Sequence, residues 1–173
     1  MTKKEFLNAI TNAKMDIIQA FLDALSGLNV DYCVIGGLAI NAYAETVVGL
    51  DLDIVVATDN LESVIKAVEA DFMIQQFTYG VKLSMDMSDL RIQFHTNSRY
   101  QEFISRAAGH TVLGYEMKVA NVEDVLQGKV WAYLDENRRK SKRQKDLADI
   151  VRLIEEYPPL ADLLPESVKK RIE

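Results

Sequence analysis

Two acidic side chains, Asp51 and Asp53, interrupt the apolar run of residues 50–56. The run has the composition of a β-strand, in which side chains two residues apart point to the same face. Both carboxylates would therefore share one face, roughly 7 Å apart along the strand, while Leu52 points into the core. Mg²⁺ binds proteins through one or two carboxylates together with substrate phosphates. The pair thus predicts a magnesium site on a strand.

A double glycine, Gly36-Gly37, is separated from this acidic pair by thirteen residues. It follows the apolar run 32–35, which predicts a buried strand, and leads into residues 38–44, which predict a helix. Two glycines at such a junction let the backbone turn sharply and approach a bulky anion such as a phosphate. Taken alone, a Gly-Gly pair is most often only a tight turn. In this order and at this spacing, the double glycine and the acidic pair together predict a phosphoryl-transfer site.

These residues resemble the signature of the nucleotidyltransferase superfamily: an apolar residue, Gly-Gly or Gly-Ser, a short gap, and then Asp-apolar-Asp/Glu-apolar. The matching segments are Ile35-Gly36-Gly37 and Asp51-Leu52-Asp53-Ile54. The segment 145–150, Lys-Asp-Leu-Ala-Asp-Ile, is similar to a helix of the bacterial AbiEii-type and minimal nucleotidyltransferase toxin relatives. The segment 119–124, which leads into a predicted helix carrying Lys129, is similar to the linking segment of that family. The resemblance spans residues 28–155.

The resemblance implies an α/β (α+β) nucleotidyltransferase fold, with a small mixed sheet flanked by helices and a helical C-terminal part. It implies transfer of a nucleotidyl group from a nucleoside triphosphate (NTP) to a hydroxyl or phosphate acceptor, with two Mg²⁺ ions. Gly36 and Gly37 would then seat the phosphates, and Asp51 and Asp53 would bind metal. RNA, a protein or a small molecule could be the acceptor. The relatives also suggest a toxin–antitoxin component with a cognate antitoxin as its partner.

The family implies a third carboxylate on a later strand, and the sequence leaves its identity open. Residues 89–95 alternate, so that Asp89, Arg91 and Gln93 share a polar face. The closest alignment puts Gln93 where a carboxylate belongs, and an amide binds metal less strongly. A shift of two residues brings Asp89 into that role instead, and Asp86 is a weaker option. We expect Asp89 to be the third catalytic and metal-binding carboxylate, with a site of two carboxylates as the alternative.

Cations that could bind phosphate are concentrated late in the chain. Residues 138–145 hold six Lys and Arg in eight positions, in a chain whose net charge is −6. Such a run is most often a solvated helix junction, but it could also face a cleft and pair with a triphosphate or RNA. The resemblance favours Lys145 as a phosphate contact, with Lys129 as a second one. An ion pair between Lys145 and Asp149, four residues on, explains Lys145 equally well.

The composition indicates a folded protein, because hydrophobic residues make up 49% of 173 residues and Gly and Pro are few. The single cysteine excludes a disulfide framework. We expect a nucleotidyltransferase α/β core over residues 1–120 and a helical part over 121–173 packed on it. Helices are expected over 4–26 and 159–171. No apolar run reaches membrane-spanning length and no signal peptide is recognisable, so we expect a cytoplasmic protein without a membrane partner.

A rival hypothesis is a catalytically weakened protein of the same fold that acts as a nucleotide-binding or protein-interaction module. Two departures from the family pattern favour it. One is Gln93 at the position of the third carboxylate. The other is the run 45–50, which lacks the basic residue that many relatives carry shortly before the acidic pair.

Overall fold

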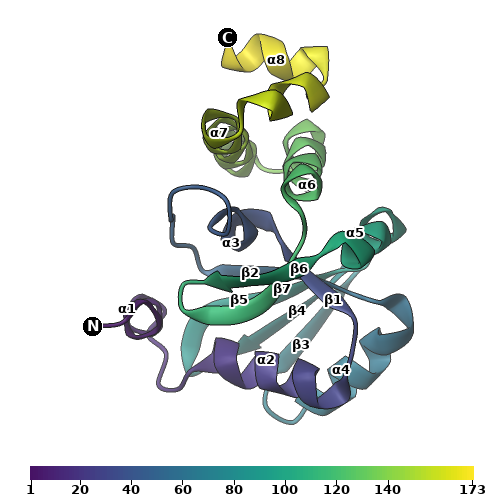
Figure 1. The fold of residues 1–173 in the computed structure, drawn as a ribbon. Helices are drawn as coiled ribbons and strands as arrows, with labels where there is room; N and C mark the ends of the chain where they lie inside the picture. Colours follow the sequence, from purple (N-terminus) through teal and green to yellow (C-terminus); the bar gives the residue numbers. More distant parts are fainter.

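Seven strands form one mixed sheet at the centre of the computed structural model, which describes residues 1–173 (Figure 1). Their order across the sheet is β3-β4-β5-β2-β1-β7-β6. The strands are β1 (Tyr32–Ile35), β2 (Asp51–Val56), β3 (Met73–Phe77), β4 (Gly80–Met85), β5 (Ser88–His95), β6 (Ala108–Val112) and β7 (Tyr115–Val119). The central strand β2 pairs antiparallel with β1 and parallel with β5. The predicted α/β class with a mixed sheet is therefore confirmed.

The sequence of β2 explains how it can lie in the middle of the sheet and still carry a polar site. Leu52 and Ile54 are completely buried on one face. Asp51 and Asp53 lie on the opposite face and are partly exposed. Because the strand period is two, burying the apolar pair necessarily turns both carboxylates toward the other side of the sheet.

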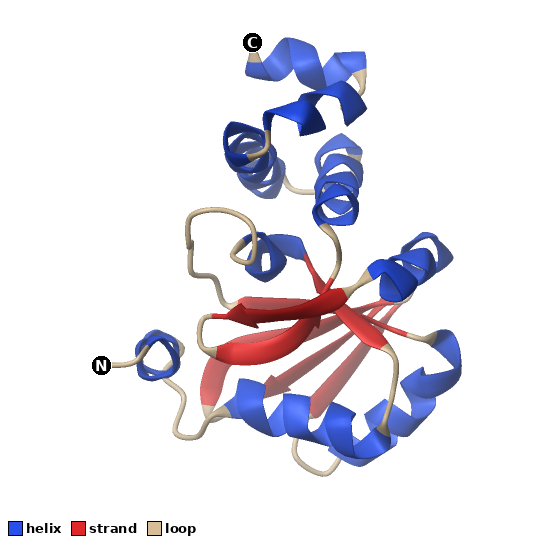
Figure 2. Cartoon of the chain, in the orientation of Figure 1, coloured by secondary structure: helices blue, strands red, loops and turns tan.

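Helices cover both faces of the sheet (Figures 1 and 2). The α-helices are α1 (Lys3–Ile10), α2 (Ile17–Leu28), α3 (Gly36–Ile40), α4 (Leu61–Val68), α5 (Gln101–Arg106), α6 (Val122–Leu134), α7 (Lys140–Glu156) and α8 (Glu166–Ile172). Three 3₁₀ helices connect them: η1 (Thr58–Asn60), η2 (Ser98–Tyr100) and η3 (Pro158–Leu163). Helices α2 and α4 lie on one face, and α3 lies on the other, below α6 and α7. The acidic face of β2 therefore points toward the C-terminal helices.

Two expected helices are each divided, and the single-helix prediction is wrong in both cases. The segment 4–26 forms α1 and α2, because Asn12 adopts a left-handed conformation with φ of 51° and Asp16 starts the second helix by accepting a hydrogen bond from the backbone of Gln19. The segment 159–171 forms η3 and α8, because Pro165 is extended and α8 begins directly after it.

One apolar core joins the sheet to the C-terminal helices. Phe21 of α2 packs against Phe94 of β5, with ring centroids 5.8 Å apart. On the other face, Leu126 of α6 and Ile150 of α7 are buried in the same cluster as Leu38 of α3. The division at residue 120 stays a prediction, since the core is continuous across it. None of the helices combines the length and apolar character that crossing a membrane requires.

Candidate active site

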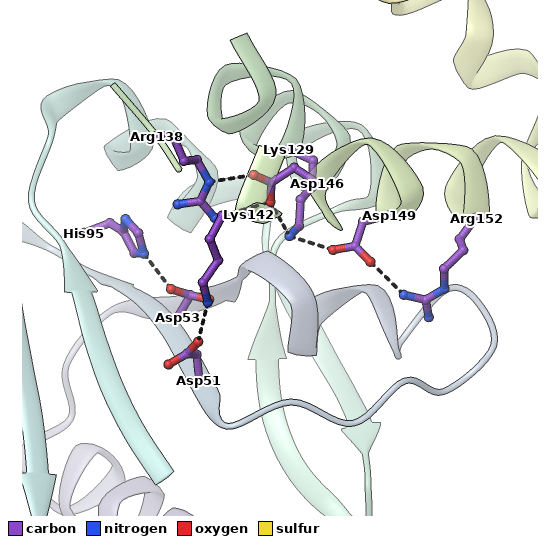
Figure 3. Close-up of polar contacts among 9 residues, drawn as sticks. All are labelled: Asp51, Asp53, His95, Lys129, Arg138, Lys142, Asp146, Asp149 and Arg152. Atoms are coloured by element: carbon purple, nitrogen blue, oxygen red, sulfur yellow. Dashed lines mark hydrogen bonds and ion pairs between the residues drawn. The ribbon is translucent and has the colours of Figure 1, made fainter. Parts of the chain in front are cut away.

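The acidic pair of β2 lies opposite polar residues of β5. Their parallel pairing places Asp51 opposite Arg91 and Asp53 opposite Gln93. The Nε atom of Arg91 is 2.8 Å from Asp51 Oδ1. Lys142, which reaches down from α7, places its Nζ 3.7 Å from Asp51 Oδ2 (Figure 3). Asp51 therefore lies between a cation of the sheet and a cation of the C-terminal helices.

Both carboxylate oxygens of Asp53 have close neighbours. His95 Nε2, from the end of β5, is 2.8 Å from Asp53 Oδ1 (Figure 3). The other oxygen faces Gly36, where a Cβ would lie 2.5 Å from Asp53 Oδ2. Burial opposes ionisation of Asp53, but the hydrogen bond from His95 and the positive charges of His95, Lys129 and Arg138 hold its pKa below the ordinary value. Asp53 is therefore a carboxylate that stays ionised.

The double glycine forms the turn from β1 into α3. Gly36 has φ of +71°, a conformation that residues with a Cβ rarely adopt. The missing side chain lets the turn approach Asp53 closely. A Cβ on Gly37 would meet no atom within 4 Å, and Gly37 lines a small hollow next to the acidic pair. The structure thus brings Gly36, Gly37, Asp51 and Asp53 together, as the sequence predicts.

A cleft of about 450 Å³ opens over the acidic pair, between the sheet and α6 and α7. This volume falls in the range of small-molecule sites. Six cationic and four acidic residues line it, so its charge is positive although the chain is acidic overall. The charged residues are Lys82, Arg91, Arg99, Lys129, Arg138 and Lys142, and Asp51, Asp53, Asp135 and Asp146. An anion larger than a single phosphate fits this cleft in both size and charge.

A chain of ion pairs runs along one wall of the cleft, from Arg138 through Asp146, Lys129 and Asp149 to Arg152 (Figure 3). Lys129 Nζ is 3.0 Å from Asp146 Oδ1 and 2.7 Å from Asp149 Oδ2. Burial alone would lower the pKa of Lys129, but Asp149 and Asp146 together raise it. Three cations and two carboxylates make up this chain, so one positive charge remains uncompensated beside the cleft.

Arg152 extends the chain of ion pairs to the loop between α3 and β2, because it also donates a hydrogen bond to the backbone oxygen of Glu45. The same loop is fixed from within by two hydrogen bonds between the Asn41 side chain and the Val47 backbone. The loop leads directly into Asp51. The C-terminal helices therefore help to fix the segment that carries the acidic pair.

The two predicted phosphate contacts occupy different positions. Lys129 lines the cleft, but its side chain is 8% exposed and bound to two carboxylates. Lys145 is exposed, lines the small hollow beside the double glycine, and lies 3.6 Å from where a Cβ of Gly49 would be. Asp149 binds Lys129 and Arg152, so Lys145 is free of the ion pair that the sequence offered as its alternative explanation.

Comparison with known proteins identifies the family of this chain. The sequence model of the family described as "Nucleotidyl transferase AbiEii toxin, Type IV TA system" matches residues 38–173. The chain belongs to this family. The match confirms the predicted relationship to AbiEii-type nucleotidyltransferases, and with it the predicted enzyme class. A comparison with curated protein sequences gives no match.

Solved structures share the fold of this AbiEii-family chain. ANT(2")-Ia in complex with adenylyl-2"-tobramycin has a TM-score of 0.65 at 16% identity, over 91% of this chain and 97% of that one. The lincosamide antibiotic adenylyltransferase LnuA, bound to lincomycin, has a TM-score of 0.57 at 12% identity, over 82% and 98%. A putative nucleotidyltransferase from Thermotoga maritima has a TM-score of 0.55 at 13% identity, over 87% and 95%. At these identities the likeness establishes the nucleotidyltransferase fold.

The structure of this AbiEii-family protein does not bring Asp89 to the cleft. Asp89 is exposed at the start of β5, where its side chain accepts a hydrogen bond from Asn12 in the α1–α2 connection. Asp86 is exposed in the turn before β5. Gln93 occupies the position beside Asp53. No three His, Cys, Asp or Glu residues gather in a group that could hold a metal ion.

The donor set nevertheless fits Mg²⁺. This ion takes one or two carboxylates and fills its other positions with water and substrate phosphates. Asp51 and Asp53 supply two oxygen-donor groups at the floor of a cleft suited to a polyphosphate, and the lowered pKa of Asp53 keeps that group charged. The cations beside Asp51 compete with metal while no phosphate is bound, and a phosphate would offer them a second partner.

Several site residues were not predicted from the sequence. His95 is the clearest case, since a single histidine without ligand spacing gave no signal for a metal site. The alternation of residues 89–95 did contain the information, because His95 lies on the same face as Arg91 and Gln93. Arg138 and Asp146 could not be paired from the sequence, because their contact depends on the path of the connection between α6 and α7.

Proposed function

We propose that this chain is a Mg²⁺-dependent nucleotidyltransferase that transfers a nucleotidyl group from an NTP to a hydroxyl or phosphate acceptor. The observation that carries the proposal is the contact between Gly36 and Asp53 at the floor of a positively charged cleft. A turn that a phosphate can approach and a carboxylate that can hold metal are here in direct contact. The lining of the cleft is positive although the chain as a whole carries a net charge of −6. This local positive charge supports binding of a triphosphate.

The charged residues of the cleft and of the small hollow beside the double glycine have different roles in this proposal. Asp51 and Asp53 would hold one or two Mg²⁺ ions together with the phosphates. Lys142 and Lys145 would pair with the triphosphate. Arg138 and the buried Lys129 would add positive charge at the wall of the cleft. Bound Mg²⁺ supplies positive charge where negative charge increases on the reacting phosphates.

In the transfer, the acceptor oxygen forms a bond to the α-phosphorus while the bond from that phosphorus to the β-phosphate oxygen breaks. Pyrophosphate leaves. A hydroxyl acceptor gives its proton to solvent water, whereas an ionised phosphate acceptor has no proton to lose. The positive groups around the cleft stabilise the charge that moves to the leaving phosphates. The fixed orientation of Asp53 between His95 and Gly36 keeps the metal-binding oxygens in place during this step.

The acceptor is RNA, a protein or a small molecule in this proposal. The family description supports a toxin of a toxin–antitoxin pair, with a cognate antitoxin as a further partner. The ANT(2")-Ia and LnuA structures, with adenylyl-tobramycin and lincomycin, suggest small hydroxylated acceptors as probes.

A weakened catalyst that binds nucleotide or a protein partner is the second candidate. One observation favours it, namely that Gln93 and not a carboxylate stands beside Asp53 while Asp89 lies outside the cleft. Such a protein would bind an NTP with Mg²⁺ and transfer nothing. Binding and transfer must therefore be measured separately.

The test is incubation of the purified chain with each α-labelled NTP, with and without Mg²⁺, in the presence of total RNA, a protein extract or an aminoglycoside. We expect label on one acceptor class only when Mg²⁺ is present. Asp53→Ala should abolish transfer, whereas Asp59→Ala, an exposed carboxylate at the start of η1, should not. Transfer that survives in Asp53→Ala would show that the site is assigned wrongly. Calorimetric binding of an NTP without any transfer would favour the second candidate.

A further inference from the structure

Arg99 ends a layered stack of aromatic rings at the wall of the cleft. The rings of Phe103 and Trp131 are stacked, with centroids 5.7 Å apart and an angle of 5° between their planes. The Cζ atom of Arg99 lies 4.5 Å from the centroid of Trp131 and 5.1 Å from that of Tyr100. Contacts with two rings limit the motion of an arginine side chain that is otherwise exposed.

One side of Arg99 faces the cleft. Arg99 and Tyr100 line the cleft, whereas Trp131 and Phe103 do not. Trp131 therefore lies behind the guanidinium and the cleft lies in front of it. Arg99 also forms no ion pair, whereas Arg91 and Lys142 pair with Asp51. Its only hydrogen-bonded side-chain contact is to the hydroxyl of Tyr100, at 3.3 Å.

Two small residues form the wall of the cleft beside Arg99. Gly128 and Ala132 are one turn apart on α6 and both line the cleft. A Cβ on Gly128 would lie 3.9 Å from the rings of Phe103 and Tyr100.

The two ends of the cleft differ in the residues that line them. The residues that the cleft shares with the small hollow beside the double glycine are all charged, and they include Asp53, Lys129 and Lys142. Arg99, Tyr100, Gly128 and Ala132 belong to the cleft alone. A nucleotide whose triphosphate lies at the shared end extends its nucleoside along the cleft away from it.

We infer that Arg99 is the platform on which the nucleobase of the NTP stacks, with Trp131 and Phe103 as the layers beneath it. The inference rests on the proposed function and adds to it a base-binding residue. Guanidinium planes stack on nucleobases in many nucleic-acid-binding sites, and the contact favours the larger rings of purines. Tyr79, the other aromatic residue at the cleft besides Tyr100, is 67% exposed on the β3–β4 turn and has no ring packed behind it.

The alternative role of Arg99 is a phosphate contact, and the two roles predict different ligand dependence. A base platform should affect binding of NTPs and not of inorganic tripolyphosphate. A phosphate contact should affect both ligands equally. Calorimetric titrations of ATP, CTP and tripolyphosphate, each with the same Mg²⁺ concentration, separate the two roles.

For Arg99→Ala we expect the affinity for ATP to fall roughly threefold to thirtyfold, the range of a cation–π contact, and that for tripolyphosphate to change less than about twofold. Arg99→Lys keeps the charge but loses the plane, so it should also lose the preference for ATP over CTP. Ala132→Leu should weaken ATP binding and spare tripolyphosphate, because it fills the adjacent wall. Lys118→Ala is the matched control, since Lys118 lies on β7, outside the cleft, with its Nζ 5.8 Å from the centroid of the Tyr32 ring.

Trp131 gives a second readout, because it is the only tryptophan of the chain. ATP should change its fluorescence emission in the wild type, and tripolyphosphate should leave the emission nearly unchanged. Equal losses of ATP and tripolyphosphate affinity in Arg99→Ala, or no loss of either, overturn the inference and leave the proposed function intact. A wild-type chain that binds neither ligand overturns both.

Discussion

The imidazole of His95 lies 2.8 Å from one oxygen of Asp53, while the other oxygen lies 2.5 Å from where a Cβ of Gly36 would be. One oxygen is thus bound to the sheet, and the second is presented to the turn where a phosphate would approach. This orientation depends on three elements that meet at the centre of the fold: β5, β2 and the β1–α3 turn.

His95→Ala should raise the pKa of Asp53. The wild-type pKa lies below its usual value because the hydrogen bond and charge of His95, with Lys129 and Arg138, outweigh burial. Removing the imidazole leaves burial less opposed. The carboxyl ¹³C resonance of Asp53, followed against pH, measures this change. His110→Ala is the control, since His110 contacts Tyr43 and not the cleft; an equal shift in that variant would contradict the assignment to His95.

The same pKa predicts how stability depends on pH. A carboxyl whose pKa is lower in the folded state stabilises the fold above its unfolded pKa, about 4, and that contribution disappears as the pH falls through the folded value. We therefore expect the free energy of unfolding to fall less steeply in Asp53→Asn than in the wild type below about pH 4. Urea unfolding at a series of pH values measures the difference. Identical slopes in the two proteins would show that His95 does not stabilise the ionised form.

Gly36→Ala and Gly37→Ala should have opposite effects. At Gly36 a methyl group would lie 2.5 Å from Asp53 Oδ2 on a backbone with φ of +71°, so we expect a loss of about 1–3 kcal/mol and a displaced carboxylate. At Gly37, inside α3, a methyl group meets nothing and the helical backbone favours alanine by roughly 0.5–1 kcal/mol. Urea unfolding and NTP transfer measure both effects. Equal stability of the two variants would refute the close approach.

Lys129→Met should be strongly destabilising because it leaves two buried carboxylates, Asp146 and Asp149, with fewer partners. Breaking a buried ion pair from one side costs about 3–5 kcal/mol, and the remaining Arg138 and Arg152 should keep the loss at the lower end of that range. Lys169→Met is the control, since its pair with Glu166 is largely exposed and should contribute less than about 1 kcal/mol. Chemical denaturation compares the two variants. A loss below 1 kcal/mol in Lys129→Met would mean that the ion-pair chain does not stabilise the fold.

The sheet and the acidic pair were predictable because both follow from local alternation. Leu52 and Ile54 are buried, so Asp51 and Asp53 must share the other face. The break between α1 and α2 was not predictable, because it forms together with a contact across the chain: the Asp89 backbone donates to Thr11 O at 2.7 Å, and Asn12 binds the Asp89 side chain. The same contact holds Asp89 at the α1–α2 connection, outside the cleft. Asp89 lies on the same face of β5 as Arg91 and Gln93, as expected. It precedes the two residues that pair with Asp51 and Asp53, so it is too far from the acidic pair.

Asp89→Asn and Asp51→Asn should therefore separate a structural carboxylate from a metal-binding one. Asp51 lies in the cleft, and losing its charge should lower NTP transfer on the order of 100-fold or more, since the metal contributes several kcal/mol to such reactions. Asp89 lies outside the cleft and binds Asn12, so its variant should keep transfer within a few-fold and lose at most about 1 kcal/mol of stability. Transfer rates at saturating NTP, with circular dichroism to verify folding, compare the two. If Asp89→Asn lost transfer as completely as Asp51→Asn while remaining folded, β5 would have to shift toward the cleft when nucleotide binds, and Asp89 would be the third carboxylate that the sequence suggested.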